Sequence, residues 1–179
     1  GWQTACQKLP HWASIEDIIY PPHLSMEQCS SQPTAIYKQQ VAKRLLGNDA
    51  GTLVDLTGGY GVDFSYIVRA FRNGVYVERQ EVLCEAARHN FPLLGIGNAE
   101  IICGDGTEYL SRIDHVSMIY LDPARRDNNG GRTYGIADCT PDVTALKDVL
   151  HKYRGPLCPQ QRRHQYGLAV GGEPRLCYG

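Results

Sequence analysis

The segment formed by residues 54–63, with the sequence VDLTGGYGVD, decides the fold class of this chain. It joins a short apolar run at residues 52–56 to residues 64–71, where apolar side chains recur at the spacing of a helix that buries one face. Glycines in such a connection let the backbone turn sharply and approach a ligand that a Cβ atom would exclude. The helix that follows offers unpaired N–H groups to a carboxylate. The segment therefore predicts a strand, a ligand-binding turn and a helix.

Strands and helices alternate along the chain on both sides of this segment. Ser31 caps the first helix, which stops at Gly47, and Pro92 is expected to end the third. This alternation predicts an α/β fold with a Rossmann-like, doubly wound parallel sheet, whose ligand lies beyond the C-terminal ends of the strands. The expected strands are residues 52–56, 75–78, 101–103 and 116–121, and the expected helices are residues 32–46, 64–71, 81–90 and 140–153.

The two ends of the chain do not follow this pattern. Residues 1–31 contain three prolines and two tryptophans, and we expect an irregular N-terminal segment. Residues 154–179 fit neither template, and we expect a tail of unclear structure. Such a tail is too short to add three strands of typical length to the four that are recognisable. The sheet is therefore expected to be incomplete at its C-terminus, because the chain is a fragment or because the fold is shorter.

Composition and charge are those of one globular domain. The 179 residues are 42% hydrophobic and 21% charged, and no apolar run approaches the ~20 residues of a membrane span. The N-terminus lacks the regions of a signal peptide, so we expect a cytoplasmic protein without a membrane partner. Seven cysteines stand singly, which argues against a zinc site or a disulfide framework, and no metal is expected. A net charge of −1 still leaves room for a local basic patch.

Two cofactors fit the glycine-rich turn, a dinucleotide and S-adenosylmethionine. A dinucleotide motif needs a third glycine where Phe64 stands, and Asp63 would repel a pyrophosphate. Glu78, at the end of the second strand, can accept hydrogen bonds from the ribose hydroxyls of either cofactor. Asp105 follows the third strand, where it binds an adenine amino group or simply caps the next turn. We favour S-adenosylmethionine, with the candidate cofactor-binding residues Asp55, Thr57, Gly58, Gly59, Gly61, Asp63, Glu78, Arg79, Asp105 and Gly106.

The candidate catalytic residues follow the fourth strand and are Asp122, Pro123 and Arg125. Amino-directed methyltransferases have [D/N/S]-P-P-[Y/F/W] here, and this chain lacks the second proline and the aromatic residue. Its Asp-Pro-Ala-Arg also looks like the motif of RNA uracil-C5 methyltransferases, which need a cysteine nucleophile after a fifth strand. Cys139 instead precedes the expected last helix. Arg125 either pairs with an RNA phosphate or is an ordinary solvated charge.

Four stretches of the sequence together resemble one family: residues 19–31, 55–63, 120–127 and 137–142. Over about residues 8–153 the chain resembles bacterial class I methyltransferases that carry a C-terminal THUMP-like domain and are distantly similar to cap trimethylguanosine synthases. The resemblance implies a transferase with a seven-stranded Rossmann-like fold, in which residues 32–153 form the S-adenosylmethionine-binding methyltransferase domain. It also implies RNA modification, on rRNA or tRNA, while the THUMP-like domain has no counterpart in this sequence.

The target atom is expected to be a base nitrogen, because methylation of carbon requires a thiol nucleophile that the sequence does not place. The alternatives are an RNA uracil-C5 methyltransferase and a noncatalytic scaffold that binds cofactor or RNA.

Overall fold

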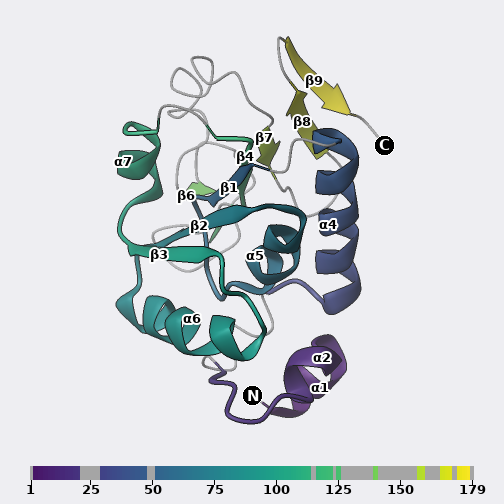
Figure 1. Cartoon of the computed structure of the whole chain (residues 1–179), viewed down its shortest axis with the longest axis vertical. Coiled ribbons are helices and arrows are strands. Elements are labelled where there is room, and N and C mark those ends of the chain that lie inside the picture. Colours follow the sequence, from purple (N-terminus) through teal and green to yellow (C-terminus); the bar gives the residue numbers. More distant parts are fainter. Residues whose placement is uncertain are drawn as a thin grey trace.

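The computed structural model describes residues 2–20, 29–47, 51–113 and 116–122, and the backbone of five short strands between residues 124 and 177. At its centre are four parallel strands, ordered β3-β2-β1-β4 (Figure 1). In their register Val54 lies opposite Val75 on one side and Ile119 on the other. The expected strands are confirmed, with bounds shifted by no more than two residues. They are β1 (Thr52–Asp55), β2 (Asn73–Glu78), β3 (Ala99–Cys103) and β4 (Met118–Leu121).

Helices cover both faces of this sheet, as the doubly wound fold requires. Alternate residues of each strand face opposite sides, so Leu53 and Tyr76 join one buried cluster and Val54 and Val75 join the other. The first cluster is covered by α4 (Gln32–Leu46), α5 (Val62–Ile67) with the 3₁₀ turn η1 (Val68–Ala70), and α6 (Glu81–Leu93), and the second by α7 (Gly106–Leu110). The predicted Rossmann-like α/β class is therefore confirmed.

The ends of two helices test the sequence signals directly. Ser31 caps α4 as predicted, since its hydroxyl accepts the N–H of Thr34 at 3.4 Å. The prediction that Pro92 ends α6 is wrong, because the helix runs on to Leu93. Pro92 lies in the last turn, and the chain leaves the helix at Gly95, whose φ of +72° favours glycine.

The N-terminal segment is more regular than expected. Its described residues, 2–20 and 29–31, include two short helices, α1 (Trp2–Lys8) and α2 (Pro10–Ala13). Pro10 stands in the first turn of α2, where a missing N–H leaves no hydrogen bond unmade. Pro10, one of the three prolines from which the sequence predicts an irregular segment, therefore starts a helix.

Several contacts dock this segment on the rest of the fold, and two of them reach α6 and the glycine loop. Asn90 of α6 accepts the N–H of Ile19 at 2.9 Å and donates to its carbonyl at 2.8 Å. The buried ring of Trp12 lies 5.4 Å from the ring of Tyr60, between centroids. Because Tyr60 belongs to the glycine loop, the N-terminal segment packs directly against that loop.

The sheet has more strands than the sequence predicts. β7 pairs with β4 in parallel, and β8 and β9 extend the sheet in antiparallel fashion to seven strands. The expectation that residues 154–179 cannot supply three strands is wrong, because these strands are only three to five residues long. Their bounds are Leu157–Pro159 for β7, Tyr166–Val170 for β8 and Glu173–Cys177 for β9.

Two further strands form a separate antiparallel pair. β5 (Ala124–Arg125) contains the candidate catalytic residue Arg125, and β6 (Cys139–Thr140) pairs with this strand. Thr140 is thus a strand residue rather than the start of a helix. The remainder of the helix expected at residues 140–153 lies outside the described residues.

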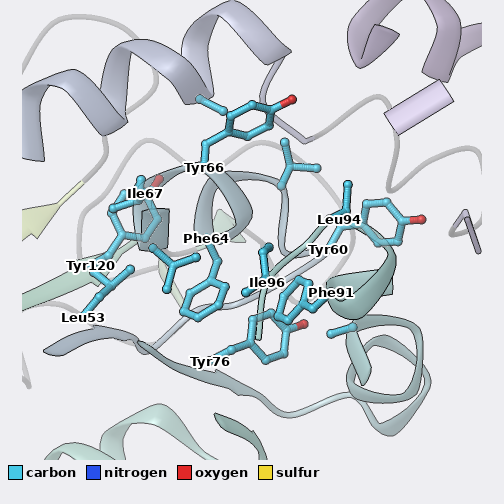
Figure 2. Close-up of a cluster of buried hydrophobic side chains, with 14 of the residues drawn as sticks. Leu53, Tyr60, Phe64, Tyr66, Ile67, Tyr76, Phe91, Leu94, Ile96 and Tyr120 are labelled. Atoms are coloured by element: carbon cyan, nitrogen blue, oxygen red, sulfur yellow. The ribbon is translucent and has the colours of Figure 1, made fainter. Parts of the chain in front are cut away.

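A cluster of three aromatic side chains packs against the glycine loop. Phe64, Tyr76 and Phe91 stand with ring centroids 5.3 to 5.7 Å apart (Figure 2). A Cβ atom at Gly58 would lie 2.3 Å from the Tyr76 ring, and one at Gly61 would lie 2.8 Å from the Phe91 ring. Packing of the loop on the core therefore requires glycine at both positions, independently of any ligand.

Gly106→Ala should destabilise the protein, whereas Gly104→Ala should be nearly neutral. A Cβ atom at Gly106 would stand 2.2 Å from the backbone oxygen of Leu56, so the loop after β1 or α7 itself would have to move. Overpacking of this kind costs about 1–3 kcal/mol. At Gly104 the nearest atom is Cγ2 of Ile102 at 3.8 Å, an ordinary contact. Urea unfolding of both variants measures the difference, and equal stabilities would contradict this packing.

Candidate functional site

Asp55 holds the glycine loop where it leaves the C-terminal end of β1. This residue is 1% exposed, and its Oδ1 accepts the N–H of Thr57 at 2.9 Å and the Thr57 hydroxyl at 3.3 Å. The same hydroxyl oxygen accepts the N–H of Asp122 at 2.6 Å. Thr57 therefore joins the loop after β1 to the end of β4. The predicted cofactor segment and the predicted catalytic segment lie side by side.

Glu78, at the end of β2, lies against the same loop. Its Oε2 accepts the N–H of Gly59 at 2.8 Å, and its Oε1 accepts the N–H of Gln80 at 2.9 Å. Gly59 has a φ of +54°, a left-handed conformation that favours glycine. The structure thus brings together two residues that the sequence predicted as one site.

Arg79 and Asp105 continue the site toward β3. The Arg79 Nε lies 3.6 Å from Asp105 Oδ2, and the two side chains are 65% and 39% exposed. Asp105 also caps α7 by accepting the N–H groups of Thr107 at 2.8 Å and Glu108 at 3.2 Å. Although burial acts to raise the pKa of Asp105, these hydrogen bonds and Arg79 hold it below its ordinary value. The capping role is therefore present, and one carboxylate oxygen faces Arg79.

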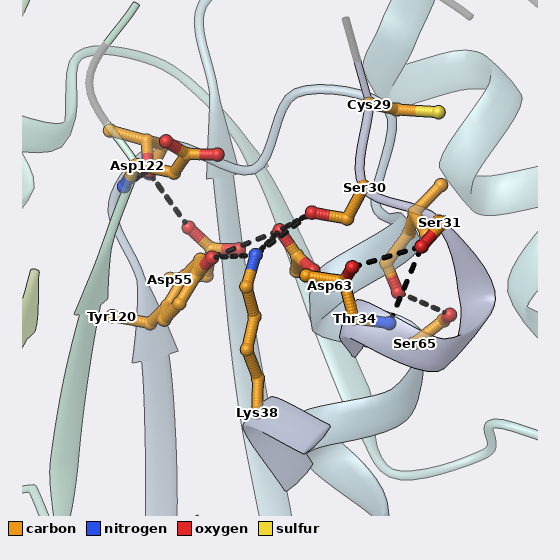
Figure 3. A network of polar contacts seen from close by, with 12 residues as sticks. Cys29, Ser30, Ser31, Thr34, Lys38, Asp55, Asp63, Ser65, Tyr120 and Asp122 are labelled. Atoms are coloured by element: carbon orange, nitrogen blue, oxygen red, sulfur yellow. Dashed lines mark hydrogen bonds and ion pairs between the residues drawn. The ribbon is translucent and has the colours of Figure 1, made fainter. Parts of the chain in front are cut away.

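A buried polar network lies on the other side of the loop and was missed by the sequence analysis. Figure 3 shows Lys38 reaching from α4 toward Asp63, Ser30 and Tyr120. Its Nζ donates to Asp63 Oδ2 at 2.7 Å, to the Ser30 hydroxyl at 2.8 Å and to the Tyr120 hydroxyl at 3.0 Å. Both hydroxyls donate in turn to Asp63 Oδ2, at 3.0 and 2.9 Å. Lys38 and Asp63 are only 8% and 12% exposed, so the ion pair is largely desolvated.

The second oxygen of Asp63 differs from the first. Oδ1 is buried and finds no hydrogen-bond partner among the residues that the structure describes. A buried carboxylate oxygen without a donor is costly, and it marks a position where a ligand donor would stabilise the protein.

Negative charge exceeds positive charge around the loop. Burial raises the pKa of Asp55 well above its ordinary value, a hydrogen bond from Thr57 opposes this rise, and Asp63 and Asp122 add to it. Asp63 and Asp122 are thus close enough to Asp55 to affect its ionisation, and Lys38 is the buried cation of the network among the described residues. Such a site suits a ligand that carries positive charge.

The structure describes the three candidate catalytic residues to different extents. Asp122 is half-buried at the end of β4, with its N–H held by Thr57. Pro123 lies outside the described residues. Arg125 lies in β5, opposite Cys139 of β6, and its backbone alone is described. The sequence predicts Cys139 just before a helix, whereas the structure places it in strand β6, opposite Arg125.

One sequence signal could have revealed the network. Ala35, Lys38 and Ala42 recur at helical spacing on the buried stripe of α4, which puts a charged residue in line with buried alanines. A lysine at such a position needs a buried partner. Nothing in the sequence alone identifies Asp63 as that partner, because the pairing depends on how α4 packs against α5.

Comparison with known proteins supports this fold. No family model matches the chain, and no curated protein matches it. Among solved structures, a proposed methyltransferase from Porphyromonas gingivalis W83 is 37% identical, with a TM-score of 0.73 over 88% of this chain and 38% of that chain. The chain therefore spans well under half the length of this relative.

Two more distant structures share the fold. A proposed methyltransferase from Streptococcus mutans in complex with SAH is 16% identical, with a TM-score of 0.52 over 73% of each chain. An rRNA methylase from Streptococcus thermophilus is also 16% identical, with a TM-score of 0.51 over 69% of this chain and 67% of that one. At this identity the likeness concerns the fold alone, which is the Rossmann-like fold of methyltransferases.

Neither a metal-binding cluster nor a membrane-spanning helix is present among the described residues. No group of three or more histidine, cysteine, aspartate or glutamate side chains is arranged to hold a metal ion in the part of the chain that the structure describes. Within that same part, no helix has the length and apolar character needed to span a membrane.

Proposed function

We propose that this chain is the cofactor-binding part of an S-adenosylmethionine-dependent methyltransferase. The observation that carries the proposal is the acidic cluster around the glycine loop, in which Asp63 Oδ1 is buried without a donor. S-adenosylmethionine presents a sulfonium and an ammonium group, which complement such a site, whereas a dinucleotide would add phosphate charge to it. The 37% identity to a proposed methyltransferase supports the same conclusion.

The residues present fit this cofactor. Asp63 Oδ1 would accept a hydrogen bond from the ammonium group of the methionine moiety. This group would supply the donor that the buried oxygen lacks. Glu78 would accept hydrogen bonds from the ribose hydroxyls, since its carboxylate has lone pairs beyond those that bind the N–H groups of Gly59 and Gln80. Arg79 and Asp105, next along the same edge of the sheet, would border the adenine. When bound, the cofactor supplies an electrophilic methyl group.

Asp122 is the proposed acceptor for the substrate. Its backbone is fixed to the glycine loop through Thr57, so its position relative to the cofactor segment is set. From there its carboxylate would accept a hydrogen bond or a proton from the target nitrogen and so raise the nucleophilicity of that atom. Pro123 and Arg125 continue the segment, and we propose that Arg125 contacts a substrate phosphate.

The proposed substrate is a base nitrogen in RNA. The support is the resemblance of residues 120–127 and 137–142 to RNA-directed methyltransferases, together with an rRNA methylase among the structures that share the fold. Nucleoside mass spectrometry of rRNA and tRNA from a strain lacking the gene tests this directly. We expect the loss of one methylated purine. Loss of 5-methyluridine with methylated purines intact would contradict the nitrogen target and favour carbon chemistry through a cysteine.

A further inference from the structure

Three donors from different parts of the chain converge on one oxygen of Asp63 (Figure 3). Lys38 comes from α4, Ser30 from the segment before it and Tyr120 from β4, and all three donate to Oδ2. Lys38 also donates to both hydroxyl oxygens. A hydroxyl that accepts a hydrogen bond points its own hydrogen toward another acceptor. Lys38 therefore directs the hydrogens of Ser30 and Tyr120 toward Asp63.

The donors around this carboxylate are distributed unequally. A carboxylate oxygen has about two lone pairs, so the three donors at Oδ2 use its full capacity. Oδ1 is buried, and no donor to it is found among the residues that the structure describes. One oxygen of Asp63 is thus an anchor, and the other keeps its capacity for a ligand. The orientation of Oδ1 depends on the packing of α4 and β4 around α5.

The anchored carboxylate lies on the side of the sheet where the proposed cofactor and acceptor segments meet. Tyr120, which donates to Asp63, stands opposite Asp55 in the register of β1 and β4. Asp55 in turn holds the glycine loop through the N–H of Thr57. Asp122 follows Tyr120 by two residues, and alternate residues of a strand face the same side. The network therefore connects Asp63 to the strand that ends at the proposed acceptor.

We propose that Ser30, Lys38 and Tyr120 are positioning residues that make the site selective for a cofactor with an amino group, an inference that rests on the proposed function. They act through Asp63, because donors that hold Oδ2 keep Oδ1 in place for the ammonium of the methionine moiety. An acceptor that is already oriented loses little conformational freedom when the ligand binds. Removal of one donor lets the carboxylate turn, which weakens its contact with the ammonium and leaves contacts with the adenosine part intact.

The test compares, by isothermal titration, the binding of SAH and of its deamino analogue, in which a hydrogen atom replaces the amino group. The unmodified protein should prefer SAH by about 10–100-fold, the effect of one hydrogen bond between charged groups. Tyr120→Phe removes only the hydroxyl and should raise the Kd for SAH by about 5–10-fold. The Kd for the deamino analogue should stay within about twofold of its original value, because Asp63 does not contact that ligand through an ammonium.

Two further variants complete the test. Ser30→Ala removes a different donor from the same oxygen and should show the same selective loss of affinity for SAH. Tyr66→Phe is the matched control for Tyr120→Phe. Tyr66 is a buried tyrosine of α5, the helix that carries Asp63, and its hydroxyl has no hydrogen-bond partner among the described residues. Its removal should leave the Kd values of both ligands unchanged.

Three results would overturn the inference. In the first, Tyr120→Phe and Ser30→Ala weaken the binding of both ligands equally, so that the two residues support the site as a whole and not the recognition of the amino group. In the second, both variants bind SAH as tightly as the unmodified protein. In the third, the unmodified protein binds SAH and the deamino analogue with equal affinity. Failure of the unmodified protein to bind SAH at all would instead refute the proposed function, and the inference with it.

Discussion

Lys38→Met should lower the free energy of unfolding by about 3–5 kcal/mol, the cost of removing one partner from a buried ion pair. The side chain is 8% exposed and its Nζ donates to Asp63, Ser30 and Tyr120, so the substitution leaves a buried carboxylate without its cation. Urea unfolding measures the loss. Lys43→Met, at an exposed position of the same helix, is the matched control and should change stability by less than about 0.5 kcal/mol.

A second variant separates the charge from the packing. In Lys38→Met combined with Asp63→Asn, no unpaired charge remains, and we expect most of the lost stability to return. A single Lys38→Met variant as stable as the Lys43→Met control would contradict the buried network. So would a double variant that is much less stable than the single one.

Asp122→Ala should reduce methyl transfer from labelled S-adenosylmethionine to RNA by about 100-fold or more, the effect of losing a group that accepts a proton or positions the target. The RNA is taken from a strain lacking the gene, so that its target positions are unmodified. SAH affinity should change little, because the contact between Asp122 and Thr57 uses the backbone N–H and survives the substitution. A loss of transfer with binding retained therefore identifies a role in the reaction.

The matched control is Glu100→Ala, which removes an exposed carboxylate from β3 and should leave transfer unchanged. Transfer that persists at the original rate in Asp122→Ala would show that this residue is not the acceptor. SAH binding without transfer to any RNA by the unmodified protein would favour the noncatalytic scaffold.

The central part of the fold could be predicted because its signals are local. Residues 54–71 combine a strand end, glycines and a helical spacing in one short stretch, and the structure has β1, the loop and α5 in this order. Ser31 and Pro33 likewise mark the start of α4 without reference to the rest of the chain. Such signals depend on the backbone of a few neighbouring residues.

The remaining features depend on contacts between distant parts of the chain. The sequence predicts Gly58 and Gly61 as ligand-binding glycines. In the structure, the atoms that exclude a Cβ atom at these positions are those of the Tyr76 and Phe91 rings. The partner of the buried Lys38 is Asp63, which lies 25 residues away in the sequence, so the residues around Lys38 do not identify it. Strands as short as β7 have too few residues to show an alternating pattern.

The most direct test of the central claim is isothermal titration of the reduced protein with SAH and, separately, with NAD. We predict heat of binding with SAH and none with NAD. Glu78→Ala should weaken SAH binding by about 10–100-fold, the effect of losing hydrogen bonds to a charged group worth about 1.5–3 kcal/mol. Heat with NAD and none with SAH would contradict the account, because the glycine loop and Glu78 would then serve a dinucleotide.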